Sequence, residues 1–317
     1  MQTSMRTVDL RQIEIFYYVA KYLSFSKAAE ALLLTQPTIS GHIKALEESL
    51  DLTLFDRLGR EVCLTRAGDV LYGYAKRLLT TKASALQALQ ELHGGLRGEL
   101  VIGGSSIPGQ YVLPRILGKF QPQYPGITVV LNITDTMETL ERIVRGDLEL
   151  GIVGAVVPHA HIEYHPFMED ELVLAVAADH PWAMQSAVPL AALPEQVFIQ
   201  RERGSGSRLV VEQTLASAGL DPSHLHVVAE MATTEAIKQG IKAGLGISII
   251  SRLALEDEVR AGSICTVAIA DVTIQRPFSV IRHTGRSLSP LAQTFERFVR
   301  GFSPLDLSVR ETLRYGG

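Results

Sequence analysis

The segment Phe25–Glu47 places the strongest constraint on the fold, because its pattern predicts two short helices joined by a tight turn. Thr35 can cap the second helix, and Pro37 is tolerated in its first turn, where a backbone N–H would have no partner anyway. Apolar residues then recur at steps of four, three and four and form one face, which consists of Ile39, Ile43, Leu46 and Leu50. An ordinary helical hairpin on the surface of any domain would show the same pattern.

The rest of the second predicted helix carries polar groups that suit the major groove of DNA. Amide and hydroxyl groups can hydrogen-bond to base edges, and a lysine can pair with a phosphate. The residues expected to contact DNA from this helix are Thr35, Gln36, Pro37, Thr38, Ser40, His42 and Lys44. The alternating segment that follows predicts a small β-hairpin, or wing, whose Arg57 and Arg60 are well placed to touch phosphate or the minor groove.

A longer amphipathic helix is predicted between Thr65, a suitable N-cap, and His93. Its seam positions step alternately by three and four, as in the heptads of a coiled coil. The predicted dimer seam consists of Leu71, Tyr74, Leu78, Ala85 and Leu92, with Thr81 and Ala88 at the intervening positions. The alternative is a single amphipathic helix packed on its own domain. Glycines at 94, 95 and 98 end the helix and indicate a hinge.

From Glu99 onward, predicted strands alternate with predicted helices, which indicates an α/β fold with mainly parallel sheets. Strands are expected at 100–104, 127–133, 150–154, 172–178, 197–200, 227–230 and 247–251, and helices at 112–123, 138–145, 207–218, 234–243 and 290–302. Ligands in such folds bind at the carboxyl ends of strands, close to helix N-termini.

Two segments at such positions have groups that can hold an oxyanion. Residues 103–109 combine glycines with two serines, and residues 201–208 add arginines to glycines and serines. Each segment is equally typical of an ordinary strand-to-helix turn that is capped by serine.

The N-terminal region resembles the LysR-type transcriptional regulators. The matching residues are Phe16, Phe25, Ala28, Ala29, Leu32, Thr35, Gln36, Pro37, Ile39, Ser40, Ile43, Leu46, Glu47, Leu50, Leu54, Phe55, Arg57, Arg60, Leu64, Thr65, Ala67 and Gly68. Gly41 and His42 depart from the family pattern, in which many members have a longer basic or amide side chain first. The resemblance covers essentially the whole chain. It implies a winged helix-turn-helix domain (1–66), a dimerising linker helix and hinge (67–98), an effector-binding domain (99–302) and a C-terminal tail (303–317).

The resemblance also implies that the effector-binding domain has two α/β subdomains, similar to periplasmic binding proteins, with the effector in the cleft between them. Subdomain I would comprise 99–167 and 268–302, and subdomain II would comprise 168–267. The candidate effector residues, from the resemblance and the two oxyanion segments together, are Ser105, Ser106, Ile107, Thr136, Gln200, Arg201, Arg203, Ser205, Ser207, Thr233 and Thr234.

Three motifs narrow the resemblance to one branch of the family. Residues 166–171, 201–208 and 244–248 are most similar to the branch that includes regulators of sulfur assimilation, sulfite reduction and carbon fixation. Effectors in that branch are small anions or anionic metabolites. Sulfite or sulfate is therefore the first expectation for this chain, and a carboxylate or sugar phosphate is the second.

Net charge does not explain DNA binding in this chain. It has 30 Lys and Arg residues against 34 Asp and Glu residues, for a formal net charge of −4. Binding must therefore depend on local basic residues, on helix N-termini and on the joining of two copies. The expected partners are a double-stranded DNA operator, a small anionic effector and further copies of the chain, as a homodimer and, from the resemblance, a homotetramer. Activation and repression both remain open.

Several other classes of protein are disfavoured. The N-terminus lacks the apolar segment of a signal peptide, and no apolar run approaches the length of a membrane span, so a cytoplasmic protein without a membrane partner is expected. Cys63 and Cys265 indicate inert thiols, with a redox switch as the alternative. His159, His161 and His165 lack neighbouring Cys or carboxylate ligands and predict a surface loop rather than a metal site.

No catalytic motif, metal or cofactor is expected. The alternative function is a small-anion-binding protein or enzyme with an accessory helical domain.

Overall fold

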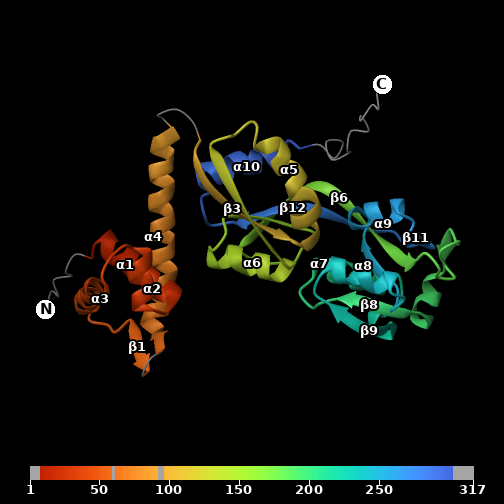
Figure 1. Cartoon of the computed structure of the whole chain (residues 1–317), viewed down its shortest axis with the longest axis horizontal. Helices are drawn as coiled ribbons and strands as arrows, with labels where there is room; N and C mark the ends of the chain where they lie inside the picture. Colours follow the sequence, from red (N-terminus) through yellow and green to blue (C-terminus); the bar gives the residue numbers. More distant parts are fainter. Residues whose placement is uncertain (1–7, 59–60, 92–95, 303–317) are drawn as a thin grey trace. The chain divides into compact units, whose positions relative to one another are not determined.

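The computed structural model describes residues 8–58, 61–91 and 96–302, and the chain divides into two compact units, Met1–Leu89 and Gln90–Gly317 (Figure 1). The first unit contains α1 (Leu10–Tyr22), α2 (Phe25–Ala31), α3 (Gln36–Leu50), β1 (Phe55–Leu58), β2 (Glu61–Leu64) and most of α4 (Arg66–Glu91). No helix in the described part of the chain is long and apolar enough to cross a membrane. Helix α4 clusters with the first unit as far as Leu89. The boundary expected between residues 66 and 67 stays a prediction.

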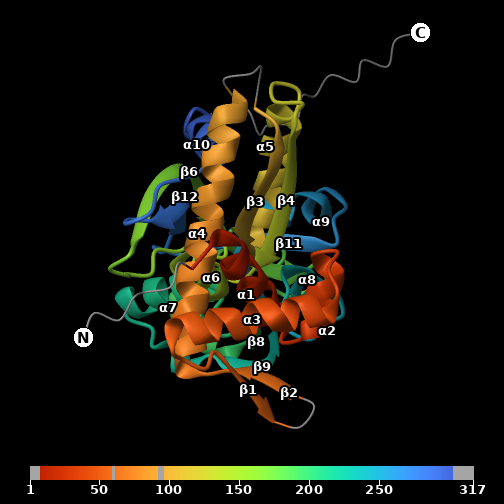
Figure 2. The same ribbon diagram turned by 90° about the vertical axis from the view of Figure 1, so that its left-hand side faces the viewer.

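The helices of the first unit are capped by their own side chains. Asp9 and Gln12 form a capping box at α1, Ser24 caps α2, and Thr35 accepts a hydrogen bond from the Thr38 amide at α3. The buried faces meet in a core that includes Ile13, Phe16, Val19, Phe25, Ala28, Ile39, Ile43, Leu46, Leu54 and Phe55. The predicted helix-turn-helix is therefore present, with α2 and α3 as its two helices (Figure 2).

The hairpin is held to α3 by a single carboxylate. Glu47 accepts hydrogen bonds from the Leu54 amide at 2.7 Å and from the Phe55 amide at 3.3 Å, just where β1 begins. β1 and β2 then pair antiparallel, as predicted for the wing. Gly68 lets α4 approach this corner closely, because a Cβ there would meet the Leu54 carbonyl oxygen.

The second unit alternates strands and helices. Its strands are β3 (Gly98–Ser105), β4 (Ile127–Thr134), β5 (Leu150–Val153), β6 (Ile162–Ala177), β7 (Ala187–Val188), β8 (Val197–Arg201), β9 (His226–Met231), β10 (Ser248–Ser251), β11 (Ile264–Ile269) and β12 (Ile274–His283). Its α-helices are α5 (Leu113–Phe120), α6 (Thr136–Arg145), α7 (Gly206–Ser217), α8 (Thr234–Lys242), α9 (Glu256–Arg260) and α10 (Pro290–Arg300). The predicted mixture of helices and strands is confirmed.

The prediction of mainly parallel sheets is wrong for the largest sheet, whose order is β4-β3-β5-β12-β6-β11-β7, with β10 also paired to β6. β3 runs parallel to β4 and β5, but β12 is antiparallel to β5 and β6, and β10 and β11 are antiparallel to β6. The sequence pattern missed β11, β12 and the first half of β6. In β6, residues 163–169 are polar or half-exposed and show neither an apolar run nor clean alternation.

Two main apolar cores lie along the long strands β6 and β12. The first, which defines subdomain I, gathers β3, α5 and α10 around Phe120, Phe278 and Phe295. The second, which defines subdomain II, gathers β8, β10 and α7 around Phe198, Leu215 and other residues. Ile269 and Ile274 also pack in the second core, and the return to subdomain I expected at 268 stays a prediction.

A buried ion pair lies where β6 and β12 pass from one core to the other. Asp170 and Arg276 are direct cross-strand partners, and Arg276 Nε donates to Asp170 Oδ2 at 2.8 Å. Ser251 donates to the other carboxylate oxygen at 2.6 Å, while Arg276 Nη1 donates to Ser207 at 2.9 Å. Burial lowers the pKa of the Arg276 guanidinium, and the charge and hydrogen bond of Asp170 oppose that effect. Each of these two buried charges is therefore tolerated only while the other is present.

Replacement of Asp170 by Asn should destabilise the second unit by about 3–5 kcal/mol, because it leaves the Arg276 charge buried without its partner. Urea unfolding followed by Trp182 fluorescence measures this, since Trp182 is the only tryptophan and packs in the second core. Asp257→Asn is the matched control, because that carboxylate pairs with Arg260 at an exposed site. Equal midpoints for Asp170→Asn and the control would contradict the role of the buried pair.

Candidate functional site

The face of α3 that is predicted to read DNA is accessible to solvent. Ile39, Ile43 and Leu46 turn into the core, whereas the predicted contact residues lie outside it. Thr35, Gln36, Pro37, Thr38 and Lys44 are exposed, and Ser40 and His42 are half-buried. A Cβ at Gly41 would meet no atom within 4 Å, so this face is open to a partner.

Local hydrogen bonds already occupy part of this surface. Ser26 on α2 donates to Gln36 Oε1 at 3.2 Å, and the hydroxyls of Thr35 and Thr38 lie 2.8 Å apart. The hydrogen bond uses the Gln36 amide oxygen, and the amide nitrogen of Gln36 has no hydrogen bond to another described residue. The side chain of Arg57 and the whole of Arg60 lie outside the described residues.

The predicted seam on α4 divides into two parts. Tyr74, Leu78 and Ala85 are exposed, whereas Leu71 is half-buried against the core of its own unit. Val70 and Leu86, which the predicted seam did not include, are also exposed. The last predicted seam residue, Leu92, lies outside the described residues.

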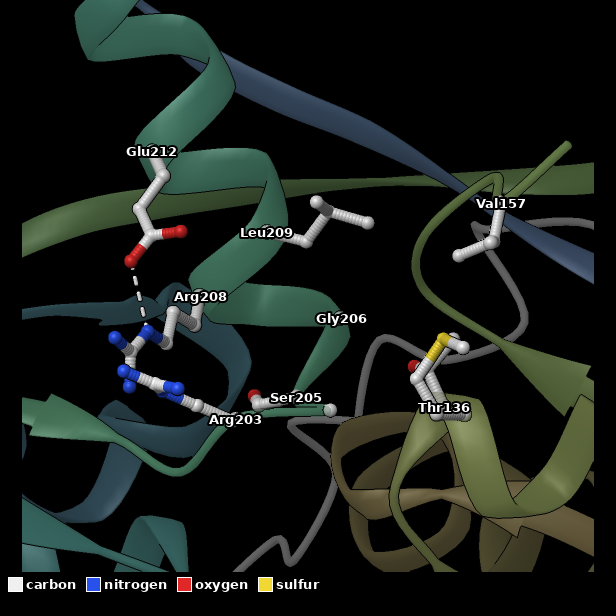
Figure 3. A pocket seen from close by; sticks show the side chains of 10 residues that line it. Thr136, Val157, Arg203, Ser205, Gly206, Arg208, Leu209 and Glu212 are labelled. Atoms are coloured by element: carbon white, nitrogen blue, oxygen red, sulfur yellow. Dashed lines mark hydrogen bonds and ion pairs between the residues drawn. The ribbon is translucent and has the colours of Figure 1, made fainter.

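A cavity of about 410 Å³ lies between the two subdomains of the second unit, where α6 faces α7 (Figure 3). It is lined by Thr136, Met137, Val157, Arg203, Gly204, Ser205, Gly206, Arg208, Leu209 and Glu212. Of the predicted effector residues, only Thr136, Arg203 and Ser205 are among them. Figure 3 shows Thr136 and Val157 across the cavity from Ser205 and Leu209.

Backbone donors open onto this cavity at the start of α7. Ser205 is the N-cap residue of α7, but its side chain makes no capping hydrogen bond. The first-turn amides of an α-helix have no partner within the helix, and its dipole leaves partial positive charge there. The N-terminus of α6 differs, because Asp135 caps it through the Glu138 amide. An anion in the cavity would therefore find its amide donors on α7.

A hydroxyl and a guanidinium add further donors. Thr136 Oγ1 is buried and has no hydrogen-bond partner in the structure. Arg203 is exposed and forms no hydrogen bond or ion pair with another described residue. Buried polar groups are normally paired, so the Thr136 hydroxyl indicates an absent partner.

Arg208 is already engaged. It donates to Glu212 and to Glu230 at 2.7 Å each, and to the Arg201 carbonyl at 3.0 Å. Burial disfavours its charge, but the hydrogen bonds to the two glutamates outweigh that effect and raise the pKa of Arg208. Arg208 therefore shapes the wall of the cavity and leaves Arg203 as the available cation.

A second group of predicted residues meets around Arg201, which is buried. Arg201 Nη2 donates to Ser106 of subdomain I at 2.9 Å, and Nη1 donates to Thr234 of subdomain II at 3.0 Å. Glu202 accepts from Arg201 through both carboxylate oxygens at 2.7 Å. Arg201 thus bridges the two subdomains while its own neighbour neutralises it.

The other predicted effector residues have structural partners. Gln200 donates to Glu212, Ser207 accepts from Arg276, and Thr233 caps α8. Ser105 is buried at the end of β3, and Ile107 packs in the first core.

Sequence reasoning missed four residues of the cavity wall, Met137, Val157, Leu209 and Glu212, whereas Gly204, Gly206 and Arg208 lie in the 201–208 segment that it named. Glu212 had a usable signal, because it lies four residues after Arg208 on the helix that starts at the oxyanion segment. Val157 had none, since it lies in a loop that only the fold brings there. Among the described residues, no group of three or more His, Cys, Asp or Glu side chains could hold a metal ion.

Comparison with known proteins links both units to one family. Residues 10–69 match the family model described as bacterial regulatory helix-turn-helix protein, lysR family, and residues 93–303 match the LysR substrate binding domain. A probable RuBisCO transcriptional regulator of Cyanophora paradoxa is 35% identical over 290 residues, which cover 90% of each chain. The RuBisCO operon transcriptional regulator of Allochromatium vinosum is 32% identical over 292 residues, which cover 92% of this chain and 95% of that one.

Solved structures agree in fold. The regulatory domain of Synechocystis CcmR in complex with 2-PG is 33% identical with a TM-score of 0.60, and the match covers 64% of this chain and 96% of that one. Full-length CbnR in complex with its target DNA is 24% identical with a TM-score of 0.66 over 92% of this chain and 99% of that one, which shows a shared fold. By their names, the two curated relatives favour the carbon-fixation side of the predicted branch and give no support to its sulfur-assimilation side.

A Gly206→Ala substitution should open the cleft, because the new Cβ would press on Thr136 Oγ1 and lie 3.0 Å from the Ala155 Cβ. Overpacking of about 1–3 kcal/mol would speed hydrogen exchange at 134–140 and 203–209 by roughly 5- to 150-fold. Adding Thr136→Ala should restore part of the protection. Gly118→Ala, where a Cβ meets nothing within 4 Å, should leave exchange unchanged. Unaltered exchange in Gly206→Ala would refute the close approach of the two helices.

Proposed function

We propose, for a chain that belongs to the LysR family of DNA-binding transcriptional regulators, that a small organic phosphate in the cleft of the second unit controls its action on operator DNA. The protein is a regulator and not an enzyme, as its family shows. One observation carries the effector proposal: the uncapped start of α7, the unpartnered Thr136 hydroxyl and the available Arg203 line the same cavity.

The size and chemistry of the cavity favour an organic phosphate over a bare sulfite or sulfate. A volume of about 410 Å³ suits a small metabolite and would leave much space around a single oxyanion. Helix N-termini and guanidinium groups are both well suited to phosphate. The apolar side chains of Met137, Val157 and Leu209 would contact the carbon part of the ligand. The related CcmR domain, which binds 2-PG (2-phosphoglycolate), supports this class of effector.

The bridge formed by Arg201 supplies a means of control. Glu202 holds Arg201 in the two-pronged geometry that a carboxylate ligand would adopt. A ligand that held α6 against α7 would keep Ser106 and Thr234 on the same guanidinium and so favour the closed cleft. The free energy of the switch then equals the difference in ligand affinity between the open and closed arrangements.

The exposed apolar residues of α4 support a dimer. Tyr74 and Leu78 are large and exposed, and Leu78 lies one heptad from both Leu71 and Ala85, which fits a seam between two copies. Leu71 contributes more to its own unit than to such a seam, since it packs against the core. A dimer presents two reading helices to two half-sites, and further pairing into a tetramer is the arrangement that the family implies.

Titration of the full chain with 2-phosphoglycolate in a calorimeter tests the effector proposal. Binding should be saturable and stronger than binding of sulfate. Arg203→Gln should weaken it roughly 10- to 100-fold, which is the usual contribution of a hydrogen bond to a charged group. Arg260→Gln removes the same charge from an exposed site on α9 and should leave affinity unchanged. Lack of 2-phosphoglycolate binding, or equal binding of sulfate, would overturn the proposed ligand class.

The reading helix is tested on duplexes that the wild-type protein selects from a random DNA pool. Gln36→Ala and Ser40→Ala should each lower the preference for the selected sequence by about 1–3 kcal/mol, because each removes a contact to a base edge. Binding to non-selected DNA should change little, since phosphate contacts remain. Ser49→Ala, near the far end of α3, is the control. Retained preference in both variants would remove these two residues from the interface.

A further inference from the structure

A second cavity, of about 520 Å³, lies on subdomain I and shares no residue with the effector cleft. It is formed by the end of β12, the loop that follows and one side of α10. Four arginines line it together with one carboxylate, and these residues are Arg282, Arg286, Arg297, Arg300 and Glu296. We call this the arginine cavity. The proposed function gives no role to these four positively charged side chains, although they line one concave site.

The described carboxylates at the arginine cavity pair with Arg282 and Arg300 and leave Arg297 unpaired. Glu296, which is buried, is shared by Arg300 at 2.9 Å and Arg282 at 3.6 Å. Glu163, from β6, reaches Arg282 at 2.9 Å. The guanidinium of Arg297 is exposed and forms no ion pair or hydrogen bond with another described residue. The guanidinium of Arg297 thus lines the same cavity as those of Arg282 and Arg300 without a carboxylate of its own, and a bound anion would relieve the repulsion among them.

The wall of the arginine cavity is held in place before any ligand arrives. Arg286 donates to the carbonyls of Ile143 and Val144 at the end of α6, at 2.9 and 2.8 Å. Gln293 donates to the Leu288 carbonyl at 2.9 Å and so fixes the loop against α10. These hydrogen bonds fix the loop between α6 and α10, so its part of the cavity wall loses little conformational entropy on binding.

We propose that the arginine cavity is a second anion site, which binds a small molecule with two or more negative charges on phosphate groups. The planar guanidinium group matches phosphate oxygens in pairs, and several such groups select for more than one charge. A cavity of this volume suits a metabolite with a diphosphate or with two separate phosphates. Arg297 and Arg300 lie on one face of α10, because they are three residues apart along the helix.

Inorganic pyrophosphate is the probe, titrated into the full chain by calorimetry. The double variant Arg297→Gln/Arg300→Gln should lower pyrophosphate affinity at least 10-fold, while Arg203→Gln, which alters only the effector cleft, should retain binding. Arg252→Gln/Arg260→Gln removes two exposed arginines from elsewhere in the second unit and should have no effect. Melting curves followed by Trp182 fluorescence check that each variant is folded.

Two results would overturn the second site. One is unchanged pyrophosphate affinity in Arg297→Gln/Arg300→Gln. The other is loss of all pyrophosphate binding in Arg203→Gln alone, which would assign the anion to the effector cleft. If the double variant keeps pyrophosphate binding but loses affinity for non-selected DNA, the arginines contact nucleic acid and the small-anion site is refuted. The test does not depend on 2-phosphoglycolate, so failure of the proposed effector would be a separate result.

Discussion

The buried pair of Arg276 and Asp170 is the interaction on which the geometry of the second unit depends. It joins β6 to β12 at the point where both strands leave one core and enter the other. Arg276 also holds Ser207 in the first turn of α7, so the same guanidinium positions the uncapped helix start that faces the cavity. A change at this pair would therefore alter both the stability of the subdomain junction and the position of the start of α7.

Helix α6 connects the main features of subdomain I. Its start carries Thr136, which lines the effector cleft, and its last carbonyls accept from Arg286, which lines the arginine cavity. The helix has only 10 residues, so a shift at one end moves the other. Anions at the two sites would thus act on one rigid element, which is a physical route for a regulator to respond to two metabolites at once.

Local rules explain where sequence reasoning succeeded. The helix pair at 25–47 was predictable because Thr35, the tolerated Pro37 and the spacing of Ile39 and Ile43 all act within a few residues. β12 and the start of β6 were missed because their stability comes from pairing with each other across more than a hundred residues. The half-exposed side chains at the start of β6 also leave no periodic pattern. The candidate site divides in the same way: the 201–208 segment was visible, but its partners Met137 and Val157 were not.

The sequence by itself determined that this chain has a helix-turn-helix pair, a long amphipathic helix and an α/β domain with a loop of arginines, glycines and serines before a helix, because each rests on short-range periodicity, capping or loop chemistry. Only the tertiary structure decided which candidate residues share a cavity. It placed Arg203 at the cavity, whereas the guanidinium of Arg201 is hydrogen-bonded to Glu202 and Ser106. It also gathered the arginines of β12 and α10 around one carboxylate. The physical reason is that charge and burial act through space, and the chain order does not reveal which side chains the folded sheet brings together.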